Sequence, residues 1–114
     1  MSTYKFLTID QGSTFAVEMY ITANDGSVFN LTGCTISGQI REYPESEEAT
    51  TAFTGTVVGS ASAGHIMLSL TDEETDLLSK RRYVYDIVIE NSVGQRYRIA
   101  EGIIEVLPGV TRTA

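Results

Sequence analysis

Residues 82–112, RYVYDIVIENSVGQRYRIAEGIIEVLPGVTR, decide the fold of this chain. Large residues, tyrosine or isoleucine, stand at every second position up to Glu90, and the turn-forming Gly94 separates this run from a second one. Gly102 interrupts the second run, and Pro108 follows a third. Alternation with a period of two is typical of a strand that buries one face. The stretch therefore predicts three successive strands at one edge of a compact antiparallel β domain, and nothing in it indicates catalysis.

Upstream of this stretch, further short runs alternate in the same way, with turn-forming residues between them. They recur about every 8–14 residues, a spacing typical of a β-sandwich or a β-barrel. The additional predicted strands are Tyr4–Ile9, Thr14–Thr22, Val28–Leu31, Cys34–Arg41, Thr51–Val58 and His65–Leu70. In the last of these, Ile66, Leu68 and Leu70 are expected to point inward. We expect a single all-β domain spanning residues 1–114, with seven to eight strands.

Local residue chemistry adds detail to these strands. Residues 24–26, NDG, are suited to a tight reversal before the short strand that follows. Gly38 lies on the apolar side of its strand, where a glycine marks either a bulge or a close backbone approach. Residues 42–50, EYPESEEAT, are polar and carry one of the two prolines, so they are predicted to form an exposed loop.

One short helix is predicted over about residues 71–79. Thr71 and Glu74 have the spacing of a capping box, in which each side chain bonds the backbone N–H of the other residue. Leu77 and Leu78 are expected to pack inward, because a helix of about two turns is unstable without tertiary contacts. We expect this helix to connect two strands.

Composition excludes several classes of partner. The chain has 114 residues, a formal net charge of −7 and a pI near 4.5. Eight Lys and Arg residues give little capacity to neutralise phosphates, and an acidic surface is not attracted to anionic lipid. We therefore expect no nucleic acid and no membrane partner. The first residues, MSTYKFLTIDQG, do not resemble a signal peptide, and no apolar run approaches the roughly 20 residues of a spanning helix.

A catalytic centre built on histidine or cysteine would have to use His65 or Cys34, because the chain has one of each. Cys34 is interpreted as a small buried hydrophobe, with a reactive thiol as the alternative. His65 occupies the polar side of its strand and is interpreted as a surface residue, with a catalytic or metal-binding role as the alternative. One His and one Cys cannot supply the usual zinc ligands. We therefore predict that the chain is not an enzyme and has no catalytic, metal-binding or cofactor-binding residues.

Two further patterns are interpreted as structural. The segment Glu42–Glu48 offers carboxylate oxygens to a hard cation, but Pro44 interrupts it and the spacing of a calcium loop is absent. Gly55 and Gly59 are not followed by the Lys and Ser or Thr of a phosphate-binding loop. The chain also has no Trp on which a sugar could stack. We expect no cofactor and no small-molecule substrate.

Six tyrosines are many for a chain of this length. Tyr83 and Tyr85 share one face of a predicted strand, and Tyr97 lies in the next strand, so the rings can pack across strands. We interpret them as core residues. An interface patch is the alternative, because Tyr is enriched where proteins meet.

Asp86 lies between two apolar neighbours and is interpreted as half of a structural ion pair. If the strand that ends at Arg41 is its neighbour, Arg41 could donate to both carboxylate oxygens. Arg98 is the alternative partner.

The order of landmarks along the chain carries a resemblance to a known family. In sequence they are D10-x-G12-x-x-F15, NDG at 24–26, LTG at 31–33, QIR at 39–41, GHIMLSL at 64–70, the short helix, YVYDI at 83–87, Gly94, Gly102 and VLPGVTR at 106–112. This order resembles the small immunoglobulin-like β-sandwich module of tailed-bacteriophage structural proteins. It is similar to the N-terminal domain of upper baseplate proteins, over about residues 6–112.

The resemblance implies an antiparallel immunoglobulin-like β-sandwich of seven to eight strands with one short helix. It also implies a non-enzymatic virion protein, such as a baseplate component, a neck or tail adaptor, or a capsid decoration. Such a protein is assembled in the host cytoplasm and docks on other virion structural proteins in multiple copies. Because the sequence stops at Ala114, just after the VTR at 110–112, we expect a free-standing module.

Docking would use loops or strand edges. The polar N-terminal residues and the loop at 42–50 are the expected contact elements, and edge strands are a second option. The alternative function is a carbohydrate- or receptor-binding module of a phage adhesion apparatus. That function needs an exposed aromatic platform, so burial of Tyr83, Tyr85 and Tyr97 would count against it.

Overall fold

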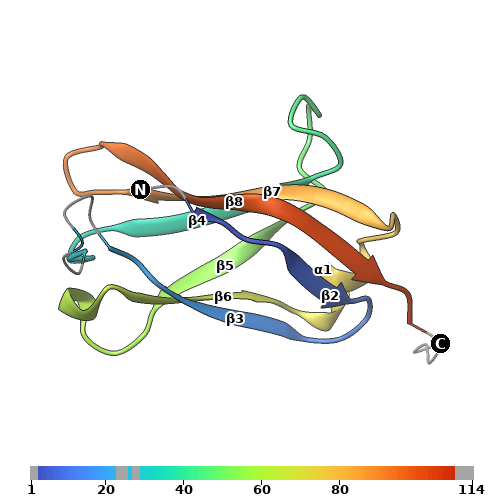
Figure 1. Cartoon of the computed structure of the whole chain (residues 1–114), viewed down its shortest axis with the longest axis horizontal. Coiled ribbons are helices and arrows are strands. Elements are labelled where there is room, and N and C mark those ends of the chain that lie inside the picture. Colours follow the sequence, from blue (N-terminus) through green and yellow to red (C-terminus); the bar gives the residue numbers. More distant parts are fainter. Residues whose placement is uncertain (1–2, 23–25, 27–28, 110–114) are drawn as a thin grey trace.

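The computed structural model describes residues 3–22, 26 and 29–109, and it is an all-β structure (Figure 1). The strands in this part of the chain are β1 (Thr3–Tyr4), β2 (Leu7–Asp10), β3 (Phe15–Tyr20), β4 (Thr35–Arg41), β5 (Thr51–Val57), β6 (His65–Leu70), β7 (Arg82–Glu90) and β8 (Arg96–Leu107). A 3-10 turn, η1 (Ala61–Ala63), precedes β6, and a helix, α1 (Asp72–Asp76), follows it. The number of strands agrees with the seven to eight expected.

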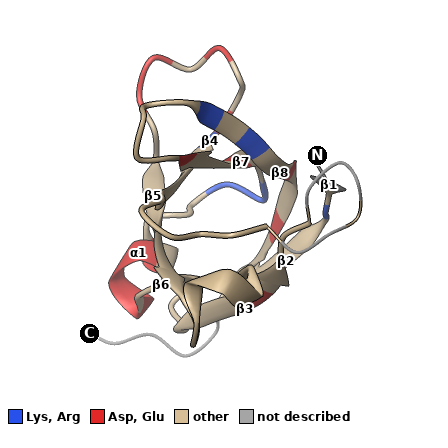
Figure 2. Cartoon of the chain, turned by 90° about the vertical axis from the view of Figure 1, so that its left-hand side faces the viewer, with Lys and Arg blue, Asp and Glu red and all other residues tan. Residues whose placement is uncertain are grey.

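All these strands belong to one continuous sheet. Its order is β1-β8-β7-β4-β5-β6-β3, and β2 also pairs with β8. Figure 2 looks along the strands and shows the sheet curled into a nearly closed, barrel-like tube, with β2 and β3 brought near each other. Curling places the apolar faces of the strands around one interior.

The sheet is mixed, which corrects the expectation of a purely antiparallel arrangement. β1 and β2 run parallel to β8, with Thr3 opposite Ala100 and Leu7 opposite Ile104. The separation in sequence is the same at both places, so β1 and β2 are two pieces of one strand in a single register. Parallel neighbours need a long crossover connection. Here the crossover is almost the whole domain, which local sequence patterns do not reveal.

Gly102 lies where β1 and β2 are interrupted. A Cβ at this position would collide with the carbonyl oxygen of Lys5, so glycine permits the close approach. The hydroxyl of Tyr85, the residue opposite Gly102 on β7, donates a hydrogen bond of 2.7 Å to the same oxygen. The predicted break at Gly102 is therefore wrong: β8 continues through it, and residues 82–109, the described part of the stretch, form two strands instead of three.

The interior is filled as the alternation predicted. In β6, Ile66, Leu68 and Leu70 are fully buried while the residues between them are half-exposed. The buried apolar residues are Leu7, Ile9, Ile21, Leu31, Ile40, Phe53, Ile66, Leu68, Leu70, Leu78, Tyr83, Tyr85, Ile87, Ile89, Ile99, Ala100, Ile104 and Val106. They come from nearly every strand, so the hydrophobic effect stabilises the curled sheet as a unit.

Gly38 marks a close approach, one of its two predicted meanings. A Cβ there would lie 2.5 Å from the Cδ1 atom of Ile87, its partner on β7. The bulge of this sheet is elsewhere: Ile87 pairs with Ala100 and Val88 pairs with Arg98, so Ile99 is the extra residue in β8.

The segment between β3 and β4 differs from its prediction. Residues 23–25 and 27–28, which include most of the predicted reversal, lie outside the described residues. Phe29 to Leu31 do not form the expected strand. Phe29 N–H donates to the Ile21 carbonyl at 3.1 Å, and Leu31 is buried in the core.

The helix begins as predicted and ends earlier. Thr71 caps it in a complete capping box with Glu74. Leu78 is buried, but Leu77 is 56 % exposed, which corrects the expectation that both pack inward. The fully buried polar residue is Thr75: its hydroxyl donates to the Ser13 carbonyl at 2.9 Å and accepts from Gly12 N–H at 3.0 Å. These bonds fasten α1 to the turn between β2 and β3.

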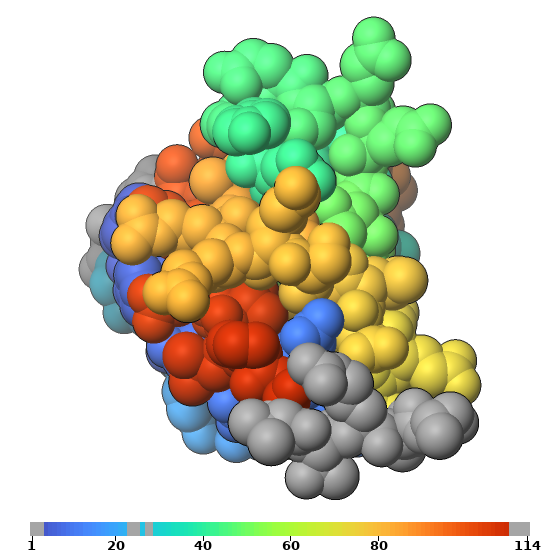
Figure 3. Space-filling model, turned by 90° about the vertical axis from the view of Figure 1, so that its right-hand side faces the viewer, coloured from blue at the N-terminus to red at the C-terminus, as the bar shows by residue number. Residues whose placement is uncertain are grey.

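The loop at residues 42–50 is confirmed as an irregular connection between β4 and β5. Figures 1 and 2 show it standing above the part of the sheet that contains β7 and β8. Figure 3, which shows the opposite end of the molecule from Figure 2, has the same loop as the green projection above β7.

Candidate functional site

His65 lies at the start of β6 and is less exposed than expected. Its ring stacks on Tyr20, with centroids 4.2 Å apart and planes at 15°. Its Nε2 atom is 3.5 Å from a carboxylate oxygen of Glu18, and only 15 % of its side chain is exposed. His65 lies on the outward side of β6, as expected, but Tyr20 on the neighbouring strand covers most of its ring. No hydroxyl or thiol nucleophile is hydrogen-bonded to it among the described residues.

Cys34 lies just before β4 and is half-buried against the core. Its Sγ atom contacts the Thr32 carbonyl oxygen at 4.0 Å. The arrangement agrees with a small apolar packing residue, although burial is only partial.

Among the residues that the structure describes, no group of three or more His, Cys, Asp or Glu side chains is placed to hold a metal ion. The same part of the chain contains no helix long and apolar enough to span a membrane.

The tyrosines divide into two groups. Tyr83 and Tyr85 are buried, which confirms their interpretation as core residues, and Tyr97 is half-buried. The exposed tyrosines in the described residues are Tyr4, Tyr20 and Tyr43, at 64 %, 74 % and 63 %. Two of them, Tyr4 and Tyr43, flank the same surface, the solvent-facing side of β4, β7 and β8, which we call the outer face.

Tyr85 faces the interior under this surface. Burial, with a smaller contribution from Tyr4, raises the pKa of Tyr85 from 10.0 to about 12. Removing the phenolic proton would also break the bond to the Lys5 carbonyl. The neutral hydroxyl therefore contributes to the attachment of β1 and β2 to the sheet.

Strand register sets the residues of the outer face in rows across β4, β7 and β8. From one end to the other, the rows are Thr35–Glu90–Arg96, Ser37–Val88–Arg98, Gln39–Asp86–Glu101 and Arg41–Val84–Ile103, and beyond the end of β4 Arg82 pairs with Glu105. The face carries four arginines and four carboxylates, so its formal charge is zero. The net charge of −7 comes from other parts of the chain.

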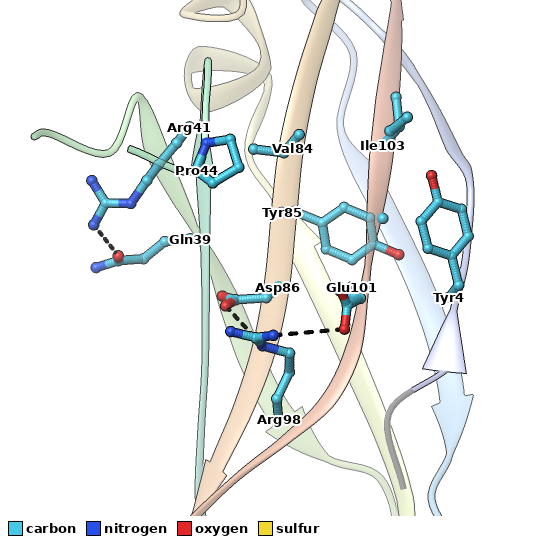
Figure 4. A pocket seen from close by; sticks show the side chains of 11 residues that line it. Tyr4, Gln39, Arg41, Pro44, Val84, Tyr85, Asp86, Arg98, Glu101 and Ile103 are labelled. Atoms are coloured by element: carbon cyan, nitrogen blue, oxygen red, sulfur yellow. Dashed lines mark hydrogen bonds and ion pairs between the residues drawn. The ribbon is translucent and has the colours of Figure 1, made fainter. Parts of the chain in front are cut away.

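Two shallow hollows lie on the outer face, of about 310 and 420 Å³. Val84 and Ile103 line both, so these two half-buried residues lie between them. Figure 4 shows the smaller hollow, with Tyr4 on one side and Pro44 of the loop on the other. Phe6, which is 51 % exposed, extends the row of apolar residues beyond Ile103. The common register of β1 and β2 sets Phe6 opposite Ile103. We call Tyr43, Val84, Ile103 and Phe6 the apolar stripe.

Asp86 pairs with Arg98, the alternative partner predicted from the sequence. Its Oδ2 atom lies 3.4 Å from Nε of Arg98, which also contacts Glu101 at 3.7 Å (Figure 4). The first choice, Arg41, is wrong. β4 does neighbour β7, but Gln39 is the residue opposite Asp86. Arg41 donates to the Ser46 carbonyl at 3.0 Å and to Gln39 at 2.7 Å, so it holds the loop against its strand.

Sequence reasoning missed the apolar stripe. The available signal was the presence of valine and isoleucine at the polar-side positions of β7 and β8: Val84, Val88 and Ile103. A strand that buries only one face usually has polar residues there. Such residues therefore mark the side that could contact another molecule.

No protein-family model matches the chain, and no curated protein matches it either.

Proposed function

We propose that this chain is a non-enzymatic structural protein of a tailed-bacteriophage virion that docks on other virion proteins. Baseplate, neck or tail adaptor, and capsid decoration are the positions that the resemblance of the sequence implies. Within this proposal, the curled sheet is a variant of the immunoglobulin-like sandwich, with β1 and β2 added in parallel to β8.

The observation that carries the proposal is a surface suited to protein contact on a rigid β framework. The outer face has an apolar centre, Val84 and Ile103, surrounded by charged residues. Protein interfaces have this anatomy, an apolar core and a polar rim. The loop at 42–50 borders the face and supplies Tyr43, an exposed side chain of a type that interfaces favour.

A strand edge is a second contact element. Among the described residues, β3 pairs only with β6, at one edge of the sheet. A partner strand could hydrogen-bond to the other side of β3.

The test is the composition of the particle. Mass spectrometry of purified virions of the phage that encodes this chain should detect it at a fixed copy number. A cryo-electron microscopy map should contain density for it in contact with another virion protein. Absence of the chain from purified particles would overturn the proposal.

The alternative, a carbohydrate- or receptor-binding module, loses two of the three tyrosines of its expected platform: Tyr83 and Tyr85 are buried, and Tyr97 is half-buried. Tyr4 and Tyr43 beside the outer face are the exposed rings that could replace it. Binding of a host-surface glycan that Tyr43→Ala abolishes would favour this alternative.

A further inference from the structure

We infer that the outer face is an interface between two copies of this chain, packed face to face about a two-fold axis. The axis runs along the strands, between β7 and β8. This inference goes beyond the proposed function: it concerns the chain in solution, whatever particle it belongs to.

The geometry of such a pair follows from symmetry. A two-fold axis along the strands exchanges the positions of β7 and β8 on the facing copy. Each β7 residue then lies over the β8 residue of its own row in the other copy. Face-to-face sheets do pack with their strands roughly aligned, and closed dimers use the same patch twice.

The end rows are complementary under this operation. Arg82 would face Glu105 of the other copy, and Glu90 would face Arg96. Each contact occurs twice, so four pairs of opposite charge form at the two ends of the interface. Opposite charges within one row are what makes the face complementary to itself.

The centre of the face is complementary in a different way. Val84 would lie over Ile103 of the other copy, so the apolar centre meets itself. Burying apolar surface is favourable by about 25 cal/mol per Å² removed from water. This contact would provide most of the affinity, and the charged rows would fix the orientation.

Two rows are not complementary. Val88 would face Arg98 of the other copy, which sets an apolar side chain against a charged one. Asp86 would face Glu101 of the other copy, which brings carboxylates together. Arg98 lies against both carboxylates within its own chain, at 3.4 and 3.7 Å. It therefore supplies positive charge to the row of carboxylates.

The two borders of the outer face, the loop at 42–50 and the β1–β2 edge, would contact each other across the interface. The loop with Tyr43 stands at the β4 side, and Phe6 lies on the β1–β2 side beyond β8. The two-fold operation places the loop of each copy beside the β1–β2 edge of the other. The apolar stripe thereby continues across the interface from Tyr43 to Phe6.

Charge argues for this face over others. A second copy carries the same net charge of −7, so most surfaces of two copies repel. The three strands of the outer face have no formal net charge, so contact through them limits this repulsion, although the bordering loop at 42–50 carries four glutamates.

The interface would be modest in size. Three strands of about seven residues cover roughly 14 by 24 Å, and the loop and β1–β2 edge extend this area. The three strands alone would bury about 700 Å² over both copies, which is below the roughly 1,200 Å² of stable interfaces. The pair is therefore a weak one, and we expect a dissociation constant on the order of 100 µM.

The first experiment is sedimentation equilibrium of the purified chain from about 10 µM to 1 mM. We expect a monomer–dimer equilibrium, and Val84→Glu should weaken it at least about tenfold, because it introduces charge at the apolar centre. Glu73→Arg on α1, outside the face, is the control and should still dimerise. Circular dichroism melting identifies any variant that fails to fold.

The second experiment tests the orientation with two variants. Arg96→Glu and Glu90→Arg each create like-charged contacts in their own homodimers, so each should associate less than the unmodified chain. Mixed together, they form opposite charges at both symmetric contacts, and a heterodimer should appear at concentrations where each alone is monomeric. A merely intrachain role for the Glu90–Arg96 pair, 3.7 Å apart, predicts no such rescue.

A chain that stays monomeric at 1 mM would overturn the inference, as would a dimer indifferent to Val84→Glu. A dimer that Val84→Glu weakens, but without rescue in the mixture, would overturn the orientation. None of these results bears on whether the chain is found in virions, so the proposed function is tested separately.

Discussion

Tyr85 combines a core position with a bond to the first strand of the sheet. Its ring lies 5.9 Å from that of Phe53, and its hydroxyl donates to the Lys5 carbonyl. Gly102 leaves the space in which Lys5 approaches β8. One tyrosine and one glycine therefore hold in place the short interruption between β1 and β2.

Tyr85 should make stability fall at alkaline pH. Its pKa is about 12 when folded, against 10.0 when exposed, so its stabilisation is complete below pH 10 and is lost as the pH rises towards 12. The loss should reach about 2 kcal/mol in free energy of unfolding at about pH 11.5. Urea unfolding at pH 8 and pH 11.5 measures it. Tyr85→Phe should lack this loss, whereas Tyr43→Phe, an exposed control, should retain it.

Asp86 should matter little to stability. Its side chain is 39 % exposed and that of Arg98 is 56 % exposed, so water screens the pair. We expect Asp86→Ala to lower the free energy of unfolding by less than about 1 kcal/mol. A loss above about 2 kcal/mol by urea unfolding would show that the pair is a structural anchor after all.

At the scale of helices and strands, sequence patterns predicted the features that depend on residues close together in the chain. The capping box of Thr71 and Glu74 lies within four residues, and the burial of Ile66 and Leu68 follows from alternation alone. The parallel pairing of β1 and β2 with β8 could not be predicted in this way, because it joins opposite ends of the chain. Register errors have the same origin: the Arg41 pairing assumed that β4 neighbours β7, which it does, but sequence patterns did not reveal that Gln39 lies opposite Asp86.

Among the candidate-site residues too, features set by one strand were predictable and features set by strand pairing were not. The burial of Tyr83 and Tyr85 follows from their shared strand face. The cover that Tyr20 provides over His65 depends on which strand pairs with β6, and sequence patterns do not state that. The outer face also depends on pairing, because its rows combine residues from three strands.

Helix α1 should depend on Thr75 for its position. Thr75→Val keeps the shape but removes the hydroxyl, leaving Gly12 N–H and the Ser13 carbonyl without their partner. We expect a loss of about 1–3 kcal/mol in free energy of unfolding, measured by urea titration. Glu73→Ala, on the exposed side of the same helix, should change it by less than about 0.5 kcal/mol. Equal effects of the two variants would contradict the role of Thr75.

The whole molecule is organised by contacts between residues far apart in sequence. The β2–β8 pairing closes the sheet last in any order that builds hairpins first, because its loop is the longest. Domains dominated by such contacts fold in milliseconds to seconds.

Leu7→Ala should therefore affect unfolding more than folding. Leu7 is buried opposite Ile104, and its truncation should lower the free energy of unfolding by about 2–5 kcal/mol. Stopped-flow measurements should assign most of this change to a faster unfolding rate. Leu68→Ala in the hairpin of β5 and β6 is the comparison and should slow folding more. A φ-value for Leu7 near one would contradict the proposed order.

The parallel pairing of β2 with β8 has a mechanical consequence. Tension applied through the chain on the N-terminal side of β2 and the C-terminal side of β8 pulls these strands along each other. Their hydrogen bonds are then loaded together in shear, whereas a hairpin pulled at its open end loses them one at a time. The same pairing that escaped prediction would make this small sheet resistant to stretching between its two ends.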